Sequence, residues 1–357
     1  MKRQSTYWRA AAWRALVLAS AISLSLAEVA NAAGPCLRGI NLSGAEFGDA
    51  GGTYGKNYIY PSEENIRYFS GKGMNTIRLP FRWQRLQPEL GKPLSDEELT
   101  HIKDTVVLAE KYHMAIVLDP HDGAYYGKSR IGTADVSEAQ FAEFWARLAA
   151  EFSGDPHVIF GLMNEPYDIA AEDWLKAANL AIRAIRAGGA ENIILVPGTY
   201  WTGAHSWMSD GPLGQNAATL LKVRDPKNNL AYEVHQYFDA DFSGTHAECS
   251  GGQKARQAIT DVGDWARKNN RKLFLGEFGV PQDTACIADL KALLETIAKN
   301  GDVWLGWTYW VAGEWWPETE PLNVQPQKGR DRQQMATLSA AARKDVAKDA
   351  ACKALTR

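Results

Sequence analysis

The stretch Val158–Glu165 reads VIFGLMNE, an unbroken apolar run that ends in an amide and a carboxylate. Strands that are buried on both faces of a parallel sheet have such continuous apolar sequences, whereas half-exposed strands alternate. Seven further runs have the same character: Leu37–Leu42, Thr76–Leu79, Ala115–Leu118, Ile193–Val196, Ala231–His235, Leu273–Leu275 and Val303–Trp310. We therefore predict eight buried strands, of which Val158–Met163 is the one in the opening stretch.

Amphipathic segments with helical spacing lie between these strands. Several begin at a serine or threonine, which favour the first capping position of a helix. The predicted helices are Ser62–Lys72, Ser95–Tyr112, Ser137–Phe152, Ala171–Ala187, Lys254–Asn269, Thr284–Asn300 and Gln334–Lys348. Eight strands that alternate with helices predict an α/β fold, a closed (β/α)8 TIM barrel, which needs about 250 residues. The rival fold, a doubly wound open sheet, normally has a glycine-rich phosphate turn after its first strand, and Arg38–Gly44 provides none.

The chain has 357 residues and a formal net charge of −3, which argues against a nucleic-acid-binding protein. Residues 1–32 have the pattern of a cleavable export signal, with positive residues, the short apolar run Ala15–Ala27 and a small-x-small site at Ala30–Ala32. The alternative is a membrane anchor, but the run is short and interrupted by serines. We therefore expect residues 33–357 to form a single secreted domain, extracellular or periplasmic, without a membrane segment.

Export would place the four cysteines in an oxidising compartment, where thiols form disulfides. Cys249 and Cys286 both follow predicted strands at one end of the fold, so we favour that pair. The remaining pair is then Cys36 with Cys352, which would join the two ends of the mature chain. The chain has neither a Cys-x-x-Cys motif nor paired histidines at ligand spacing, so we expect no metal and no cofactor.

Polar residues follow the predicted strands at the end where the active sites of such barrels lie. These strand-end residues are Arg78, His121, Asn164 with Glu165, His235 with Tyr237, Glu277 and Trp310. Glu165 follows the fourth predicted strand and Glu277 the seventh, and these two strands face each other across the mouth of a barrel. Two carboxylates in one cleft, one protonated and one ionised, suit the cleavage of a glycosidic bond.

The neighbours of the two glutamates suggest their roles. We expect Arg78 and Tyr237 to contact Glu277 and to favour its ionised form, as a nucleophile requires. Glu165 would then act first as the acid and later as the base. Asn164 would hold the sugar hydroxyl beside the reacting carbon.

Sugar rings have apolar faces that stack on aromatic side chains, and this chain is rich in tryptophan. We expect Trp310 to form the floor under the ring that is cleaved. Candidates for neighbouring sugars are Trp83, Trp201, Trp207, Trp315 and Trp316. Each strand-end residue also has an ordinary alternative: a solvated glutamate, an arginine in a structural salt bridge or a histidine in the core. The complete set, with one part at each strand end, is much more specific than any single residue.

These residues resemble glycoside hydrolase family 5, the cellulase family, and its endo-β-1,4-glucanase subgroup in particular. The motifs that carry the resemblance are Arg38–Asn41 (RGIN), Asn75–Pro80 (NTIRLP), Asp119–His121 (DPH), Gly161–Pro166 (GLMNEP), His235–Tyr237 (HQY), Gly276–Gly279 (GEFG) and Thr308–Trp310 (TYW). The resemblance implies a retaining mechanism without a cofactor, with Glu165 as acid/base and Glu277 as nucleophile. It also implies substrate contacts by Arg78, His121, Asn164, His235, Tyr237 and Trp310, and the pair Cys249–Cys286 is similar to one in the subgroup.

We expect a secreted, monomeric enzyme that hydrolyses internal bonds of a β-1,4-glucan polysaccharide or oligosaccharide. The alternatives are a mannanase or xyloglucanase of the same family and, more remotely, a non-catalytic barrel that only binds glycan. Two residues depart from the family pattern: Asp122, where relatives usually have asparagine, and Glu314, where they often have glycine or proline. The sequence assigns no role to either residue or to Asp119.

Overall fold

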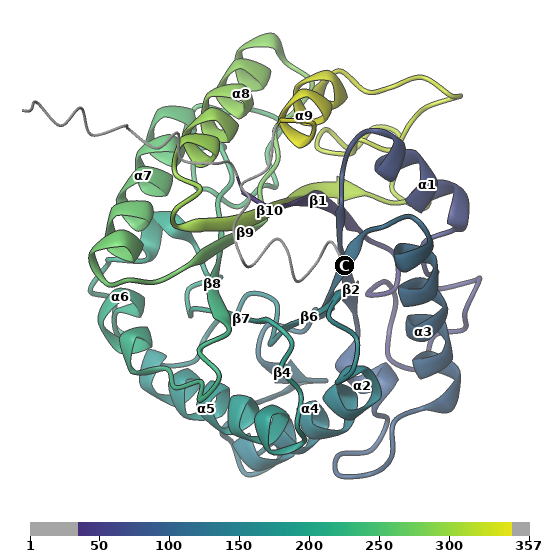
Figure 1. Ribbon diagram of the computed structural model, residues 1–357, viewed down its shortest axis with the longest axis vertical. Helices are drawn as coiled ribbons and strands as arrows, with labels where there is room; N and C mark the ends of the chain where they lie inside the picture. The colour runs from purple at the N-terminus through teal and green to yellow at the C-terminus, as the bar shows by residue number, and fades with distance from the viewer. Residues whose placement is uncertain (1–34, 345–357) are drawn as a thin grey trace, which may run out of the picture. The chain divides into compact units, whose positions relative to one another are not determined.

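The computed structural model describes residues 35–344, and in it eight parallel strands close into a barrel with helices around it (Figure 1). The strands follow one another round the barrel in the order β1-β2-β3-β6-β7-β8-β9-β10, and β10 pairs with β1. Their bounds are β1 Leu37–Leu42, β2 Thr76–Phe81, β3 Ala115–Pro120, β6 Val158–Gly161, β7 Ile194–Pro197, β8 Leu230–His235, β9 Leu273–Glu277 and β10 Trp304–Ala312. The predicted TIM barrel is therefore confirmed, and each predicted strand overlaps an observed one.

The helices form the outer layer of the fold (Figure 1). Their bounds are α1 Glu63–Gly71, α2 Trp83–Leu86, α3 Asp96–Lys111, α4 Glu138–Phe152, α5 Ala171–Ala187, α6 Asn216–Thr219, α7 Gly252–Lys268, α8 Thr284–Lys299 and α9 Gln334–Ala342. The side chains of Ser62, Ser95 and Ser137 cap α1, α3 and α4 by accepting backbone hydrogen bonds, as their sequence positions predicted. The short helices α2 and α6 and the hairpin of β4 (Tyr125–Tyr126) and β5 (Ser129–Arg130) were not predicted.

The interior of the barrel is apolar at one end and charged at the other. Toward the amino-terminal ends of the strands, Leu37, Val117, Ile159 and Leu195 belong to one buried apolar cluster. Toward the carboxyl-terminal ends, inward positions carry buried polar side chains. The polar residues here are Asn41, Arg78, Asp119, Glu233, His235 and Thr308. The barrel therefore encloses ionisable groups at the end where the sequence places the site.

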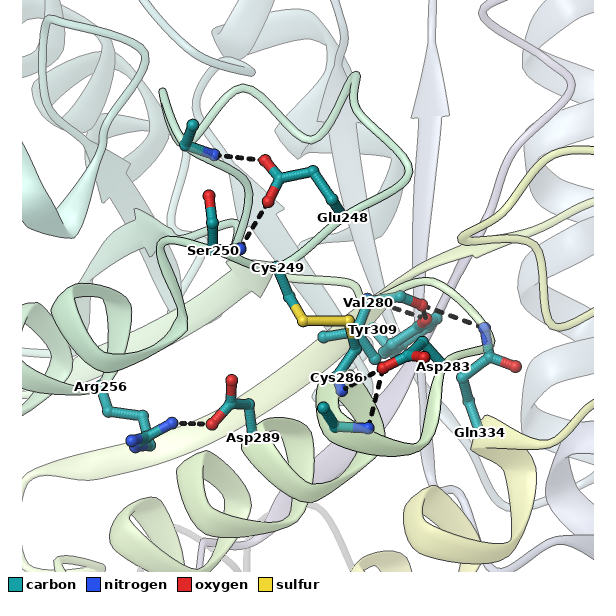
Figure 2. Close-up of a disulfide and its surroundings, with 12 residues drawn as sticks. Glu248, Cys249, Ser250, Arg256, Val280, Asp283, Cys286, Asp289, Tyr309 and Gln334 are labelled. Atoms are coloured by element: carbon teal, nitrogen blue, oxygen red, sulfur yellow. Dashed lines mark hydrogen bonds and ion pairs between the residues drawn. A yellow bond between two sulfur atoms is a disulfide. The ribbon is translucent and has the colours of Figure 1, made fainter.

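A disulfide between Cys249 and Cys286 joins the loop after β8 to the first turn of α8, which confirms the favoured pair (Figure 2). Cys352, the predicted partner of Cys36, lies outside the described residues, and so does the predicted export signal. Both therefore stay predictions. Between residues 35 and 344, every helix is too short or too polar to span a bilayer.

Candidate active site

Glu165 and Glu277 come from opposite sides of the barrel and lie close together at its mouth. Glu277 is the last residue of β9 and is buried, whereas the side chain of Glu165 is 24% exposed. Glu165 follows β6 with a left-handed backbone conformation, φ +43°, which a glutamate rarely adopts. One oxygen of each carboxylate and one ring nitrogen of His235 lie within 4.8 Å of one another. The structure thus brings two carboxylates that are 112 residues apart into one site.

Glu277 accepts hydrogen bonds from two different residues. Arg78 Nη1 lies 2.9 Å from its Oε1, and the Tyr237 hydroxyl donates to its Oε2 at 2.6 Å. Burial and the negative charge of Glu277 raise the pKa of Tyr237, so the phenol keeps its proton and remains a donor. The Glu277 carboxylate is therefore held at both oxygens, by a cation and by a hydroxyl donor.

Arg78 is fully buried and connects several of these groups. Its Nε lies 2.9 Å from Glu233 Oε1, its Nη1 lies 3.1 Å from Asp119 Oδ2, and its Nη2 donates to Asn164 Oδ1 at 2.8 Å. Burial opposes the charge of the guanidinium, but Asp119, Glu233 and Glu277 outweigh burial and raise the pKa of Arg78. Arg78 is therefore a permanent cation that fixes side chains from several strands at once.

His121 follows β3 and contacts three other residues. Its Nδ1 lies 2.8 Å from Asp119 Oδ2, and its Nε2 lies 3.2 Å from Asn164 Nδ2. Its ring is stacked on Trp310, with the centroids 5.5 Å apart and the planes 11° apart. His121 thereby holds an amide and an indole in place at the mouth.

His235 ends β8, and within residues 35–344 its ring nitrogens contact only carboxylates. Nδ1 lies 2.8 Å from Glu165 Oε1 and 3.6 Å from Glu277 Oε2. Nε2 lies 3.3 Å from Glu233 Oε1, below the mouth of the barrel. His235 therefore connects both candidate catalytic carboxylates to a third, deeper one.

Two residues that organise this site were not predicted to do so: Glu233 was not identified from the sequence, and Asp119 was identified without a role. Each lies two positions before a histidine that was identified, Glu233 before His235 and Asp119 before His121. Residues two apart on a strand point to the same face, so both carboxylates enter the barrel interior beneath the histidines. A charged residue at that spacing was the signal that could have revealed them.

Trp201 separates two hollows that both reach Glu165. Its side chain is exposed and lies parallel to Tyr167, with the ring centroids 5.7 Å apart. A hollow of about 520 Å³ lies on the side of His121, and one of about 430 Å³ lies on the side of His235. Trp201 and Glu165 line both of them.

The predictions for the other tryptophans have mixed outcomes. Trp83 and Trp207 are wrong as sugar platforms, because both are fully buried in the core. Trp83 lies in the first turn of α2 and packs on Phe144, and Trp207 packs on Trp265 of α7. Trp315 is partly exposed, and Trp316 contacts Trp310 edge-on at 6.0 Å. The sequence places a tryptophan in a loop but does not say which way the loop folds it.

Comparison with known proteins gives the family. Residues 30–313 match the family model Cellulase (glycosyl hydrolase family 5). This chain belongs to glycosyl hydrolase family 5. It is 37% identical to endo-β-1,4-glucanase A of Emericella nidulans over 321 residues, which is 88% of this chain and 94% of that protein.

Solved structures of the same family are also similar. The structure of XacCel5A in complex with cellopentaose has 48% sequence identity and a TM-score of 0.85, and the match covers 86% of this chain and 99% of that one. The endo-β-1,4-glucanase Xac0029 from Xanthomonas axonopodis pv. citri has 43% identity and a TM-score of 0.84, with 87% and 99% covered. The resemblance that the motifs predicted is therefore confirmed.

Asp122 and Glu314, the two residues expected to depart from the family pattern, both have structural partners. Asp122 accepts a hydrogen bond from the backbone N–H of Trp83 at 2.7 Å. It also forms an ion pair with Arg82, with Nη1 and Oδ1 3.3 Å apart. Burial raises the pKa of Asp122 despite these contacts. Glu314 accepts a hydrogen bond from the hydroxyl of Ser62, the residue that caps α1. Asp122 thus fixes the start of α2, and Glu314 fixes the start of α1.

In the described part of the chain, two groups of side chains near the site or the disulfide have the residue types that could bind a metal ion. The sulfur atoms of Cys249 and Cys286 lie near Asp283, but they are joined in the disulfide and are not thiolates. Glu165, His235 and Glu277 form the other group, in which both ring nitrogens of His235 already face carboxylates. Because each ring nitrogen already faces a carboxylate oxygen, neither presents a free lone pair to an ion, so this set fits an ion poorly.

Proposed function

We propose that this chain is a retaining endo-β-1,4-glucanase in which Glu277 is the nucleophile and Glu165 the acid/base. The observation that carries the proposal is the approach of the two carboxylates to within 4.8 Å at their nearest oxygens. Carboxyl groups about 5–5.5 Å apart are typical of retaining glycosidases, whereas inverting ones need about 6.5–9.5 Å to admit a water molecule. The short separation favours direct attack by a carboxylate on the sugar carbon.

The surroundings of each carboxylate suit its proposed step. Glu277, ionised beside Arg78 and Tyr237, attacks the anomeric carbon while Glu165 donates its proton to the leaving glycosidic oxygen. The result is a glycosyl ester on Glu277 and an ionised Glu165. Glu165 then takes a proton from water, and the resulting hydroxide breaks the ester, which restores both side chains. The partial exposure of Glu165 gives water access for this second step.

The hollows on either side of Trp201 support a polysaccharide substrate that is cut internally. Glu165 lies where they meet, so a chain can extend from the reacting bond instead of ending there. Trp310 would carry the ring that is cleaved, and Asn164, held by Arg78, would contact its hydroxyl. The related proteins are named endo-β-1,4-glucanases, and XacCel5A was crystallised with cellopentaose, which supports β-1,4-glucan as the substrate.

The central experiment removes the charge of one carboxylate at a time. Glu277→Gln and Glu165→Gln should each lower turnover of carboxymethylcellulose by at least about 10³-fold, with the melting temperature retained. Proton NMR of the first product of the native enzyme should show the β-anomer before mutarotation. Near-native turnover in either variant, or an α-anomeric first product, would refute the mechanism.

A panel of polysaccharides tests the sugar. The native enzyme is assayed on carboxymethylcellulose, barley mixed-linkage glucan, galactomannan and xyloglucan by release of reducing ends. We expect the highest kcat/KM on the two linear glucans. Preference for galactomannan or xyloglucan would instead make the chain a mannanase or xyloglucanase of the same family.

We also propose that the chain is exported as a monomer and that residues 1–32 are removed. The positive start, short apolar run and Ala30–Ala32 site support removal, and a disulfide at Cys249–Cys286 suits an oxidising compartment. Amino-terminal sequencing of the protein secreted by an expressing bacterium should begin at residue 33. A protein that remains in the cytoplasm with residue 1 intact would refute export.

A further inference from the structure

Glu233 is a buried carboxylate in the middle of β8, beneath the two candidate catalytic glutamates. It is 1% exposed, and its Oε1 lies 2.9 Å from Arg78 Nε and 3.3 Å from His235 Nε2. Its Oε2 is buried without a hydrogen-bond partner in the described structure. A charge that is costly to bury and only partly satisfied is expected to have a purpose beyond packing.

The barrel leaves room for this carboxylate at a glycine of the neighbouring strand. A Cβ atom on Gly276 would lie 2.1 Å from Glu233 Oε1 and 2.8 Å from His235 Nε2. Any side chain at position 276 would therefore displace the contact between Glu233 and His235. Gly276 directly precedes Glu277, so the space belongs to the site itself.

Both ring nitrogens of His235 face carboxyl groups, and ionised carboxylates at both nitrogens favour a charged ring. A neutral imidazole donates from one nitrogen and accepts at the other, whereas an imidazolium donates from both. Burial opposes the charge, but Glu277, Glu165 and Glu233 outweigh it and raise the pKa of His235 to about 10. The ionisable groups around the ring are Glu165 after β6, Glu277 on β9, Arg78 on β2, Tyr237, and Glu233, which lies on β8 like His235 itself.

We propose that Glu233 is a positioning residue that holds His235 as an imidazolium, so that its Nδ1–H faces both catalytic carboxylates. The inference rests on the proposed function, in which the negative charge moves from Glu277 to Glu165. Before the first step the charge is on Glu277, and in the covalent intermediate it is on Glu165. Nδ1 lies 3.6 Å from the first and 2.8 Å from the second, so one N–H stabilises the charge in both halves of the reaction. His235 keeps its proton throughout.

The native protein alone gives the first test. Nitrogen-15 NMR of labelled histidine distinguishes an imidazolium, protonated at both nitrogens, from either neutral tautomer. The signals of His235 are identified by their loss in His235→Gln. We expect both nitrogens to stay protonated from pH 6 to pH 9, and a neutral ring at pH 7 would overturn the proposal.

The second test removes the charge of Glu233 without removing its shape. Glu233→Gln should lower the midpoint of the His235 titration by about 1–3 pH units. It should also lower kcat on carboxymethylcellulose by about 10–100-fold, the range known for the loss of carboxylate partners of metal-bound histidines, and leave KM within about twofold. Glu233→Asp, which keeps the charge, should restore part of the titration midpoint. An unchanged midpoint in Glu233→Gln would overturn the proposal.

Asp225→Asn is the matched control. Asp225 forms a buried ion pair with Arg186 at 2.8 Å, before the start of β8 and so at the opposite end of that strand. This variant should lower the melting temperature but leave the titration of His235 and the KM unchanged, and a midpoint shift as large as that of Glu233→Gln would overturn the proposal. If the native protein cleaved no glycan while His235 still responded to Glu233, the proposed function would fail and the effect of Glu233 on His235 would stand.

Discussion

The site contains two histidines that look alike in sequence but have opposite surroundings. His121 faces the Asp119 carboxylate at Nδ1 and the amide nitrogen of Asn164 at Nε2. Arg78 donates to the amide oxygen of Asn164, so the amide must present its NH2 group to His121. One neighbour therefore accepts and the other donates, which suits a neutral ring. His235 has carboxylates at both nitrogens, which suits an imidazolium.

One residue type therefore serves two tasks in a single site. Burial lowers and Asp119 raises the pKa of His121, with a net increase, but the amide donor opposes a second proton on Nε2. A neutral His121 is free to stack flat on Trp310 and to hold Asn164, both of which are placed for the sugar. A charged His235 instead stabilises carboxylates. The first histidine positions substrate contacts, and the second controls charge.

Both histidines depend on Arg78, so its removal should have the largest effect. Arg78→Met leaves Asp119, Glu233 and Glu277 buried without their common cation. We expect the free energy of unfolding to fall by about 3–5 kcal/mol. We also expect kcat/KM on a soluble glucan to fall by about 10³-fold or more, because Glu277 and Asn164 lose their orientation. Urea titration and initial rates measure the two effects, and an active, stable Arg78→Met protein would contradict the shared role.

Substitution of each histidine should change the kinetic parameters in a different way. His235→Gln removes the cation between the two catalytic carboxylates and should lower kcat by about 10²–10³-fold. His121→Gln loses the stack on Trp310 and the contact with Asn164, so KM should rise and kcat should fall by about tenfold or less. Initial rates over a range of substrate concentrations separate the two parameters. A larger loss of kcat in His121→Gln would reverse the assignment.

The strands, the helices and most of the strand-end residues could be predicted, because burial on both faces and helical amphipathicity are local properties of the sequence. The charge states of the two histidines could not be predicted. Asn164 and Glu165 are adjacent in the chain, yet one contacts His121 and the other His235. Which histidine receives an amide and which a carboxylate depends on the left-handed backbone of Glu165, and this is not encoded in a local pattern.

Glu233 was missed for a related reason. It lies inside the run Ala231–His235, which was identified as a strand because its other residues are mostly apolar. A carboxylate in a fully buried strand is stable only beside partners from other strands, here Arg78 of β2. That partnership spans 155 residues, so the sequence alone shows the charge and not its purpose.

The charge of His235 should also appear in the pH dependence of stability. Its pKa is about 10 in the folded protein, above the value near 6.5 of an unfolded chain, so the folded state binds the proton more tightly. The resulting stability is complete below about pH 6.5 and is lost as the pH rises through 10, at up to about 1.4 kcal/mol per pH unit. Urea unfolding at pH 6 and pH 9.5 should show a smaller decrease in His235→Gln than in the native protein. The raised pKa of His121 contributes with the same sign, so the decrease in His121→Gln should lie between those of the native protein and His235→Gln, and equal decreases in the two variants would remove the contrast between the histidines.

Trp201 lies between the hollow on the side of His121 and the hollow on the side of His235. Its substitution should give the smallest change in stability. Tyr200, Trp201 and Thr202 have φ angles of +57°, +54° and +51°, a left-handed run that favours glycine. Trp201→Ala and Trp201→Gly should raise KM for a soluble glucan by similar factors, because both lose the exposed ring that lines the two hollows. The glycine variant should be at least as stable as the alanine variant, since relief of left-handed strain, about 1 kcal/mol, offsets the greater freedom of glycine in the unfolded chain. A glycine variant that is clearly less stable, measured by urea unfolding, would mean that the ring and not the surrounding loop holds this backbone in place.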